Sequence, residues 1–343
     1  MKILIAGLGS VGRRHLRNLR LLGEQDIVLY RTRLATLPDE DLVGLPVETD
    51  LDRALDGKPD AVIVANPTSL HLEVAIPAAR AGCHILLEKP VSDSLDRLGE
   101  LAEAAERTGS RIQVGFQFRF HPTLQQAARL VREGAIGQIL TAHAHWGEYL
   151  PNWHPWEDYR KSYAARSDLG GGVLVTLTHP MDYLRWLVGD VDLLWSLNGH
   201  LSPLQVDVED IAEVGLHFAS GAIGGLHVNY VQRPAVHRLE IVGTGGTLSW
   251  DNADGSLKWQ RMPAAFGESS SNPPGPVVEQ FAPPPEFERN QLFVEQMRAF
   301  LSVVRGESTP VCTLQDGIRA LEMALAARES AAQGRRIALK GIQ

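Results

Sequence analysis

The chain opens on a short apolar segment that runs directly into a glycine-rich turn. A buried strand is expected at Lys2–Ala6, and the next residues, Gly7–Gly12, read GLGSVG and fit the pattern G-x-G-x-x-G. After the turn, Val11–Leu22 places leucines on one face of a predicted amphipathic helix. A strand, this turn and a helix in that order are the setting in which the pattern predicts a dinucleotide-binding unit.

The glycines of this turn each meet a different requirement of such a site. Gly7 permits the tight turn, Gly9 lets the backbone approach a pyrophosphate, and Gly12 allows the helix to pack closely on the strand. The backbone N–H groups at Ser10 and Val11, where the helix begins, are then expected to bind the phosphates. The alternative is a glycine-rich turn without a ligand, which leaves this combination of neighbours unexplained.

The first third of the chain alternates short apolar runs with helical patterns. Further strands are expected at Ile27–Arg31, Ala61–Ala65, His84–Leu87 and Ile112–Val114. Further helices are expected at Ser69–Ala81 and Leu95–Thr108. Continuous apolar strands separated by helices favour a parallel sheet covered on both faces. We therefore predict a doubly wound Rossmann domain of the α/β class over residues 1–121.

Beyond residue 121 the pattern changes to period-two alternation. The alternating segments are Leu140–Glu148, Ala212–Phe218, Ala222–Val231, Arg238–Val242 and Thr247–Trp250. They predict an open, mostly antiparallel sheet with one face on a core. The proline-rich stretch Pro263–Pro285 is expected to be an extended surface loop, and helices are expected at Asn290–Val304 and Leu314–Ala332. We predict an α+β domain over residues 122–343 that binds substrate and mediates oligomerisation.

Composition and charge narrow the function classes. The 343 residues carry a net charge of −8, which argues against a nucleic-acid or membrane-surface binder, since both need a broad basic face. The two cysteines, Cys83 and Cys312, cannot form a disulfide framework or a four-thiolate metal site. No targeting segment precedes the first strand and no apolar stretch is long enough to span a bilayer, so a reducing cytoplasm is the expected location.

The end of the second expected strand bears on which dinucleotide is bound. An acidic residue there favours NAD, because a carboxylate accepts hydrogen bonds from the ribose hydroxyls. Here the strand ends in Arg31, Thr32 and Arg33, and no carboxylate occurs between Asp26 and Asp39. Two guanidinium groups and a hydroxyl suit a 2′-phosphate, so NADP is predicted, with NAD as the alternative. The competing interpretation is a pair of solvated surface arginines.

Two polar motifs follow the next apolar strands of the first domain. Asn66, Pro67 and Thr68 come after one strand, with His71 in the helix that follows, and Glu88-Lys89-Pro90 comes after the next. Ligands of open α/β sheets bind at the carboxyl ends of the strands. An ammonium group there can bond a reacting oxygen and stabilise developing negative charge, whereas the alternative is a solvated lysine at a strand end.

These motifs, with the Arg119–Pro122 segment and with Gly170–Gly172 followed by His179, resemble the Gfo/Idh/MocA family of NAD(P)-dependent oxidoreductases. The resemblance runs over nearly the whole chain. It implies hydride transfer between a nicotinamide and a secondary alcohol or ketone of a sugar, polyol or sugar derivative. Two alternatives within the family are a non-catalytic dinucleotide-sensing regulator and a redox-neutral lyase or glycosidase.

The resemblance assigns roles to individual residues. Lys89 matches the catalytic lysine of the E-K-P motif, and a cis peptide is implied before Pro90. His179 is the expected general acid/base, at a helix start that Thr178 would cap and whose dipole would disfavour the imidazolium. Cofactor contacts are expected at Asn66, Pro67, Thr68, His71, Glu88, Lys89 and Gln117. Substrate contacts are expected at Lys89, Arg119, Thr176, His179 and Asp182.

One position departs from the family pattern. Members commonly carry Asp three or four residues before the histidine, where this chain has Thr176. A hydroxyl can still donate and accept hydrogen bonds, but the loss of a carboxylate puts a simple sugar-dehydrogenase activity in doubt. Asp182 is retained one helical turn after His179, on the same face of the predicted helix.

Residues 146–163 are rich in aromatic side chains interleaved with charged ones. We interpret the stretch either as a substrate loop, with Tyr149 and Trp156 as contacts, or as a packing flap or subunit contact. His143 and His145 share one face of a predicted strand, but no further ligands accompany them and no metal is expected. The open sheet favours a homodimer or homotetramer.

Overall fold

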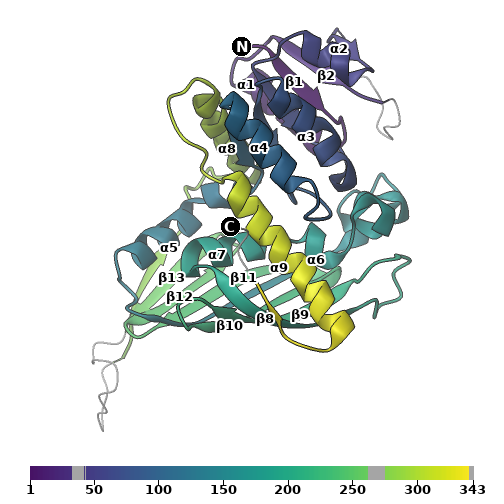
Figure 1. Ribbon diagram of the computed structural model, residues 1–343. Helices are drawn as coiled ribbons and strands as arrows, with labels where there is room; N and C mark the ends of the chain where they lie inside the picture. The colour runs from purple at the N-terminus through teal and green to yellow at the C-terminus, as the bar shows by residue number, and fades with distance from the viewer. Residues whose placement is uncertain (33–41, 43, 262–274, 340–343) are drawn as a thin grey trace. The chain divides into compact units, whose positions relative to one another are not determined.

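The computed structural model describes residues 1–32, 42, 44–261 and 275–339, and the chain divides into two compact units (Figure 1). The first unit contains Met1–Gln117, Asp168–Gly170 and Glu288–Leu321, and the second contains the remaining segments. We expected one division near residue 121. In the structure, Glu288–Leu321 from the last third of the chain also belongs to the first unit, because part of this segment lies in the apolar core of that unit.

The first unit is built on an all-parallel sheet, as predicted. Its strands are β1 (Ile3–Ala6), β2 (Ile27–Tyr30), β3 (Val47–Glu48), β4 (Ala61–Val64), β5 (His84–Leu87) and β6 (Ile112–Val114). They are arranged in the order β3-β2-β1-β4-β5-β6. This order reverses beside β1, which is the doubly wound arrangement of dinucleotide-binding domains. The short strand β3 was not anticipated, because two residues leave no periodic pattern.

The helices of the first unit are α1 (Ser10–Leu21), α2 (Leu51–Asp56), α3 (His71–Arg80), α4 (Leu98–Thr108) and α8 (Arg289–Val304). The helix predicted from Ser69 begins with a 3₁₀ turn at Thr68–Leu70. The helix predicted from Leu95 begins at Leu98, because Arg97 before it adopts a left-handed backbone conformation that a helix cannot include.

Helix α8 belongs to the first unit because it supplies part of the apolar core. Its residues Met297, Phe300 and Leu301 are buried in one cluster with Ile3 and Ile5 of β1 and with leucines of α1. Helix α1 also pairs with α8 through Asn18, whose side chain accepts a hydrogen bond from Asn290 at 2.9 Å. The apolar side chains of β1 and α1 therefore find their partners almost three hundred residues later in the chain.

Over the described residues, the second unit contains a sheet of nine strands, which is mostly antiparallel, as predicted. The strands are β7 (Ile139–Tyr149), β8 (Val191–Gly199), β9 (Ile211–Phe218), β10 (Ile223–Asn229), β11 (Val231–Gly243), β12 (Gly246–Asp251), β13 (Ser256–Arg261), β14 (Val277–Phe281) and β15 (Ile337–Ala338). Their order is β14-β13-β12-β11-β7-β10-β9-β8-β15, and β7 and β10 are the parallel pair. The prediction of a loop at Pro263–Pro285 is wrong for Val277–Phe281, which form β14 and pair with β13. Residues 263–274 lie outside the described residues.

Helices cover one face of this sheet. Helices α5 (Pro122–Arg132), α6 (Val173–Thr176) and α7 (His179–Val188) lie on one side of the strands in Figure 1. Helix α9 (Leu314–Gln333) begins in the first unit, and its last turns belong to the second, where Ser330 Oγ accepts a hydrogen bond from the backbone N–H of Ser196 in β8. On the opposite face, no helix of the described residues covers the strands.

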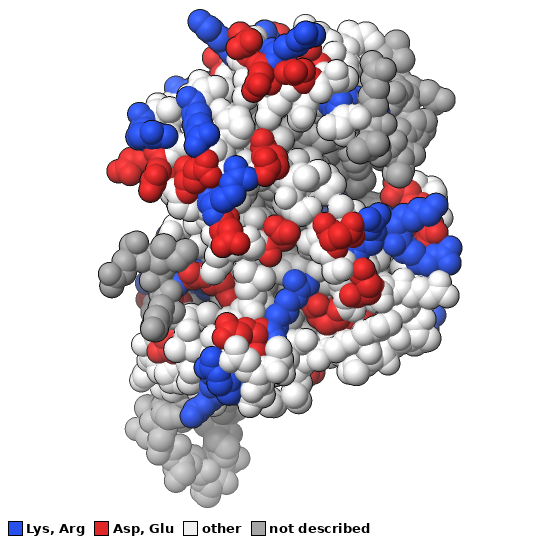
Figure 2. Space-filling view, turned by 45° about the vertical axis from the view of Figure 1, so that its right-hand side comes forward, with Lys and Arg blue, Asp and Glu red and all other residues white. Residues whose placement is uncertain are grey.

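The charged surface is mixed in sign. On the face that Figure 2 shows, Lys and Arg side chains lie beside Asp and Glu side chains rather than in one basic area. A broad basic face, which a binder of nucleic acid needs, is not seen among the described residues on this side. Among the helices that the structure describes, none combines the length and apolarity required to cross a bilayer.

Substitution of Phe300 tests whether α8 stabilises the first unit. Phe300 is completely buried among residues of β1 and α1, so we expect Phe300→Ala to lower the free energy of unfolding by about 3–5 kcal/mol. Leu21→Ala at an exposed position of α1 is the control, with an expected change within about 0.5 kcal/mol. Urea titration followed by circular dichroism measures both. Equal unfolding free energies for the two variants would contradict the assignment of α8 to this core.

Candidate active site

The glycine turn of the first unit has the close backbone packing that its pattern implies. Gly7 has φ +93°, and a side chain there would collide with the backbone of Ala65 and Asn66 after β4. A Cβ on Gly12 would collide with the carbonyl oxygen of Gly7. Both positions therefore exclude any larger residue, and together they bring the start of α1 against the ends of β1 and β4.

The start of α1 has room for a ligand. Gly9 is the N-cap of the helix, and no described atom lies within 4 Å of a Cβ built on it. Among the described residues, no side chain caps the helix, and its first turn carries no acidic residue. The buried Arg13 turns back so that its Nε donates to the carbonyl of Leu8 at 3.0 Å. An open helix N-terminus with a nearby cation suits a pyrophosphate, so these residues fit a dinucleotide.

The motifs at the ends of β4 and β5 are held by buried histidines. Both ring nitrogens of His71 face backbone carbonyls, Nδ1 that of Pro90 at 2.9 Å and Nε2 that of Asn66 at 3.0 Å. The ring of His71 is therefore occupied by the backbone of the two motifs, although we had expected it to contact the cofactor itself. On the other side of the sheet end, Nε2 of His15 lies 2.7 Å from Oε1 of Glu88.

The remaining expected cofactor residues lie at the same strand ends or just beyond them. Thr68 is buried, Asn66 donates from its side chain to the carbonyl of Leu70 at 2.9 Å, and Lys89 is half-buried before a cis Pro90. Arg31 is half-buried after β2 and Thr32 is exposed, whereas Arg33 lies outside the described residues. Gln117 is buried where the first unit ends.

Charges around Glu88 keep its carboxyl ionised. Burial raises the pKa of Glu88, but the hydrogen bond and charge of His15 and the charge of Lys89 outweigh it, so that the pKa lies below its usual value. For His71, burial dominates and lowers the pKa, while Glu88 and the backbone carbonyls oppose it. The strand end thus presents a carboxylate directly beside the ammonium group of Lys89 in the chain.

His179 lies in an aromatic cluster of the second unit. It is the first residue of α7 and is mostly buried, with its ring 5.1 Å from that of Phe118 and 5.4 Å from that of Trp146. Thr178 occupies the N-cap position, but contrary to expectation its side chain makes no capping bond, because its backbone is already helical there. The aromatic rings hold the imidazole in place at the start of the helix.

Arg119 and Asp182 contact each other in a buried ion pair. Nη2 of Arg119 donates to Oδ1 of Asp182 at 2.7 Å, and Nε lies 3.0 Å from Oδ2. The two side chains are 5% and 2% exposed. We had expected both to contact substrate; in the structure the pair ties the Gln117–Phe120 segment to α7. This pair is therefore placed to orient the helix that carries His179.

The other expected substrate residues differ in accessibility. Thr176 is buried, and its hydroxyl lies beside Tyr230, whose pKa is raised by burial and lowered in part by Thr176. Tyr149 is half-buried under the guanidinium of Arg233, 4.5 Å from the ring centre. Trp156 is 67% exposed. Of these three, the indole of Trp156 is therefore the most available to a ligand.

Two groups of contacts around α6 and α7 were not anticipated from the sequence. The ring of His237 stacks on Trp146 at 3.7 Å and pairs with Glu148, so that Trp146 lies against both His237 and His179. Separately, Arg328 bonds both the carboxylate of Glu209 and the carbonyl of Gly171. The one sequence signal for the second group was the Gly170–Gly172 run, because a side chain at Gly172 would collide with Arg328 and Glu209.

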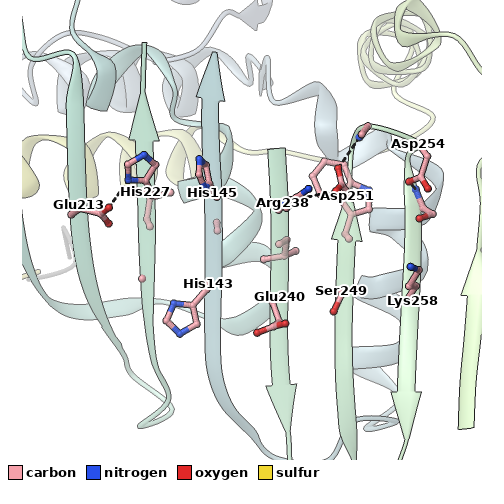
Figure 3. Close-up of a pocket in the computed structure, with 17 residues that line it drawn as sticks. His143, His145, Glu213, His227, Arg238, Glu240, Ser249, Asp251, Asp254 and Lys258 are labelled. Atoms are coloured by element: carbon pink, nitrogen blue, oxygen red, sulfur yellow. Dashed lines mark hydrogen bonds and ion pairs between the residues drawn. The ribbon is translucent and has the colours of Figure 1, made fainter. Parts of the chain in front are cut away.

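The outward face of the nine-stranded sheet carries a shallow hollow (Figure 3). Across neighbouring strands it presents Glu213, His227, His145, Arg238 and Asp251 in one row. Glu213 pairs with His227, and Arg238 pairs with Asp251 at 2.8 Å. In the part of the chain that the structure describes, no three His, Cys, Asp or Glu side chains are grouped to hold a metal ion.

Comparison with known proteins agrees with the fold and with the motifs. Residues 1–116 match the model of the Gfo/Idh/MocA oxidoreductase family for its NAD-binding Rossmann fold, and residues 128–339 match the model for its C-terminal alpha/beta domain. The solved structure of levoglucosan dehydrogenase in complex with NADH is similar over 100% of both chains, with a TM-score of 0.86 and 21% identity. That of the WlbA dehydrogenase from Bordetella pertussis with NADH and UDP-GlcNAcA covers 99% of both, with a TM-score of 0.80 and 22% identity.

Curated relatives are similar over most of their length. The 1,5-anhydro-D-fructose reductase of Ensifer adhaerens is 27% identical over 88% of this chain and 86% of its own. The myo-inositol 2-dehydrogenase of Thermotoga maritima is 25% identical over 100% of this chain and 99% of its own. Since the two family models together cover both units, from the glycine turn to β15, the chain belongs to the Gfo/Idh/MocA family of oxidoreductases.

Proposed function

We propose that the protein transfers a hydride between a nicotinamide dinucleotide and a secondary alcohol or ketone of a sugar, polyol or sugar derivative. The observation that carries this proposal is Lys89, held at the end of β5 in the same sheet whose first turn, Gly7–Gly12, is shaped for a pyrophosphate. Relatives named as a reductase of an anhydro-sugar and as an inositol dehydrogenase support the same class of substrate.

The side chains supply the proton and charge chemistry of such a reaction. The nicotinamide, when bound, donates or accepts the hydride. The ammonium of Lys89 bonds the reacting oxygen and stabilises its negative charge, because a fixed cation is most effective where charge develops. The imidazole of His179 takes up the proton of an alcohol during oxidation and returns it during reduction. The Phe118 and Trp146 rings hold that imidazole in one orientation.

We propose NADP as the preferred dinucleotide. The ribose hydroxyls of NAD are usually bonded by a carboxylate at the end of the second strand, and β2 ends instead in Arg31 and Thr32. Arg31 is held close to the sheet, since its backbone N–H donates to the carbonyl of Glu48 in β3 at 3.1 Å. A guanidinium at this place suits a 2′-phosphate.

A second candidate function is a redox-neutral reaction with a retained dinucleotide. Thr176 favours it, because the family's carboxylate for the reacting hydroxyls is replaced by a buried hydroxyl beside Tyr230. A relative from Escherichia coli, 29% identical over 58% of this chain and 54% of its own length, is named 2,7-anhydro-N-acetylneuraminate hydratase. Product formation without a net change in NAD(P)H absorbance would identify this chemistry.

We propose a homodimer or homotetramer that packs through the outward face of the sheet. The row shown in Figure 3 supports a second copy as the partner: a two-fold axis between His145 and His227 would place Glu213 of one copy opposite Arg238 of the other. On β8 the same face exposes Trp195 and Leu197, which alternate with the buried Leu194 and Ser196. Exposed apolar side chains on an uncovered sheet are typical of an interface.

A reducing cytoplasm is the location that we propose. Cys83 and Cys312 are both buried and are not joined in a disulfide, and burial raises the pKa of Cys83 to about 11. A thiol protonated at neutral pH is a weak nucleophile and resists oxidation, so Cys83 does not suit a disulfide or a catalytic thiolate.

Replacement of Lys89 tests the assignment of the reacting cation. We expect Lys89→Ala to lower kcat by about a hundredfold or more, because the charge on the reacting oxygen loses its stabilising donor. The dissociation constant of NAD(P)H should change less than about threefold, since the glycine turn is untouched. Steady-state assays with a panel of sugars, polyols and nucleotide-sugars measure kcat. Lys58→Gln, at an exposed lysine of the same unit, is the control, and equal losses in both variants would contradict the role of Lys89.

Charge reversal at the end of β2 tests the choice of dinucleotide. The wild-type protein should bind NADPH more tightly than NADH, and Arg31→Asp should weaken NADPH binding by about tenfold or more while leaving NADH binding intact or stronger. Fluorescence titration gives the four dissociation constants, with the exposed Arg20 of α1 as a control in Arg20→Asp. A wild-type protein that binds NADH at least as tightly as NADPH would refute the proposal.

A charge placed on the outward face of the sheet tests the oligomer. Light scattering at micromolar concentration should give a wild-type mass that is a multiple of 37.6 kDa. Trp195→Glu should shift the mass toward the monomer, because a carboxylate buried in an apolar contact loses its hydration. Leu21→Glu, at an exposed site on α1, should leave the mass unchanged. A monomeric wild-type protein would be the contrary result.

A further inference from the structure

Two buried histidines flank the residues on either side of Lys89. His15 lies in the second turn of α1 and is completely buried, and His71 is the first residue of α3 and is 1% exposed. His15 contacts the side chain of Glu88, and His71 contacts the backbone of Pro90. Lys89 lies between these two contacts in the chain, and the helices that provide them follow different strands.

The contact of His15 with Glu88 has one arrangement of protons. The Glu88 carboxylate can only accept, so Nε2 of His15 carries the hydrogen of the 2.7 Å bond. Nδ1 of His15 is buried and has no hydrogen-bond partner among the described residues, so a second N–H there would be left unsatisfied. Nε2 of His15 is therefore the donor to Glu88, and the link needs no partner at Nδ1.

The second carboxylate oxygen of Glu88 contacts the backbone of Lys89. Oε2 of Glu88 accepts from the N–H of Lys89 at 3.3 Å. Gly115, just after β6, leaves the space that the carboxylate occupies, since a Cβ there would lie 2.9 Å from Oε2. The carboxylate thus lies between His15 of α1 and Gly115 after β6, and it accepts a hydrogen bond from the amide of Lys89.

His71 holds the other side of the lysine. Its two ring nitrogens face the carbonyls of Pro90 and Asn66, which are both acceptors, so the neutral ring donates to one of them and the protonated ring to both. Through these contacts the residues after β5 are tied to those after β4. The backbone on both sides of Lys89 is therefore connected to buried, fixed groups.

We propose that His15 and His71 are positioning residues for Lys89, and that His15 links the helix starting at the glycine turn to the lysine through the carboxylate of Glu88. The ammonium that meets the reacting oxygen is then set in place by the same helix whose N-terminus faces the dinucleotide phosphates. The inference rests on the proposed function only for the role of Lys89. Accurate placement of such a group contributes strongly to rate, because small displacements are costly.

The link from His15 to Lys89 depends on pH, because the carboxyl of Glu88 must be ionised to accept both hydrogen bonds. Burial raises the pKa of Glu88, whereas His15 and Lys89 lower it, and Arg14 of α1 and His71 of α3 also interact with its charge. A His15→Leu variant loses the effect of His15 that lowers the pKa of Glu88, while burial still raises it, so this pKa should rise. The Glu88–Lys89 contact is then lost as the pH falls through this higher value, and the acid limb of kcat should move to higher pH.

The experiment compares His15→Leu, which removes the donor, with His15→Gln, which retains an N–H donor at a similar distance from the backbone. His84→Gln is the matched control, because His84 begins the same strand β5 and instead accepts a bond from the N–H of Arg111 at 3.0 Å. Hydrogen exchange of the Lys89 amide and ¹³C titration of the Glu88 carboxyl report the link without any turnover. The kcat and KM values report its consequence.

We expect His15→Leu to speed exchange at Lys89 by about tenfold or more and to raise the pKa of Glu88. Its kcat should fall by about tenfold or more with little change in KM, and His15→Gln should recover part of both effects. His84→Gln should match the wild type. If His15→Leu does not fold, His71→Leu replaces it in the exchange measurement, because it frees the carbonyls of Pro90 and Asn66.

Unchanged exchange at Lys89 and an unchanged Glu88 titration in His15→Leu would overturn the inference, whatever the activity. If both change while Lys89→Ala retains full turnover, the link stands and the proposed role of Lys89 falls. The two ideas therefore fail through different measurements.

Discussion

The first unit depends on the close backbone approach of Gly12 to Gly7. No side chain fits at either glycine, and this absence lets α1 begin directly against the ends of β1 and β4. Once α1 is fixed there, its buried face brings leucines to the core and His15 to Glu88. This one steric constraint therefore determines two features. It places the N-terminus of α1 where a phosphate can bind, and it brings His15 to the carboxylate of Glu88 after β5.

In the second unit, charged groups are used to hold helices in position. The Arg119–Asp182 pair and the Glu209–Arg328 pair lie around α6 and α7, and each carboxylate receives more than one hydrogen bond. Buried charges are costly to desolvate, and they are tolerated where their geometry satisfies them. Both pairs therefore help to hold the helices around His179, and the substrate contacts expected of Arg119 and Asp182 stay predictions.

Much of the fold could be predicted because its periodic patterns are strong. The five longer strands of the first sheet and five of the nine described strands of the second follow from apolar runs and alternation. Strands β8, β13, β14 and β15 were not predicted; β15, like β3, has only two residues, and β14 lies within a proline-rich segment. The Asn66–Thr68 and Glu88–Pro90 motifs lie directly after β4 and β5, as the sequence predicts. The mutual pairing of Arg119 with Asp182, and of His71 with two carbonyls, depends on side-chain packing that spacing along the chain does not encode.

The place of α8 in the first core has a consequence for biosynthesis. While the ribosome is still translating the second unit, β1 and α1 lack Met297, Phe300 and Leu301, which complete their apolar cluster. The emerging first unit must therefore keep an apolar surface exposed until about residue 301 has left the exit tunnel. Such late, long-range contacts slow folding, so this chain is most exposed to aggregation during the interval before α8 has been synthesised.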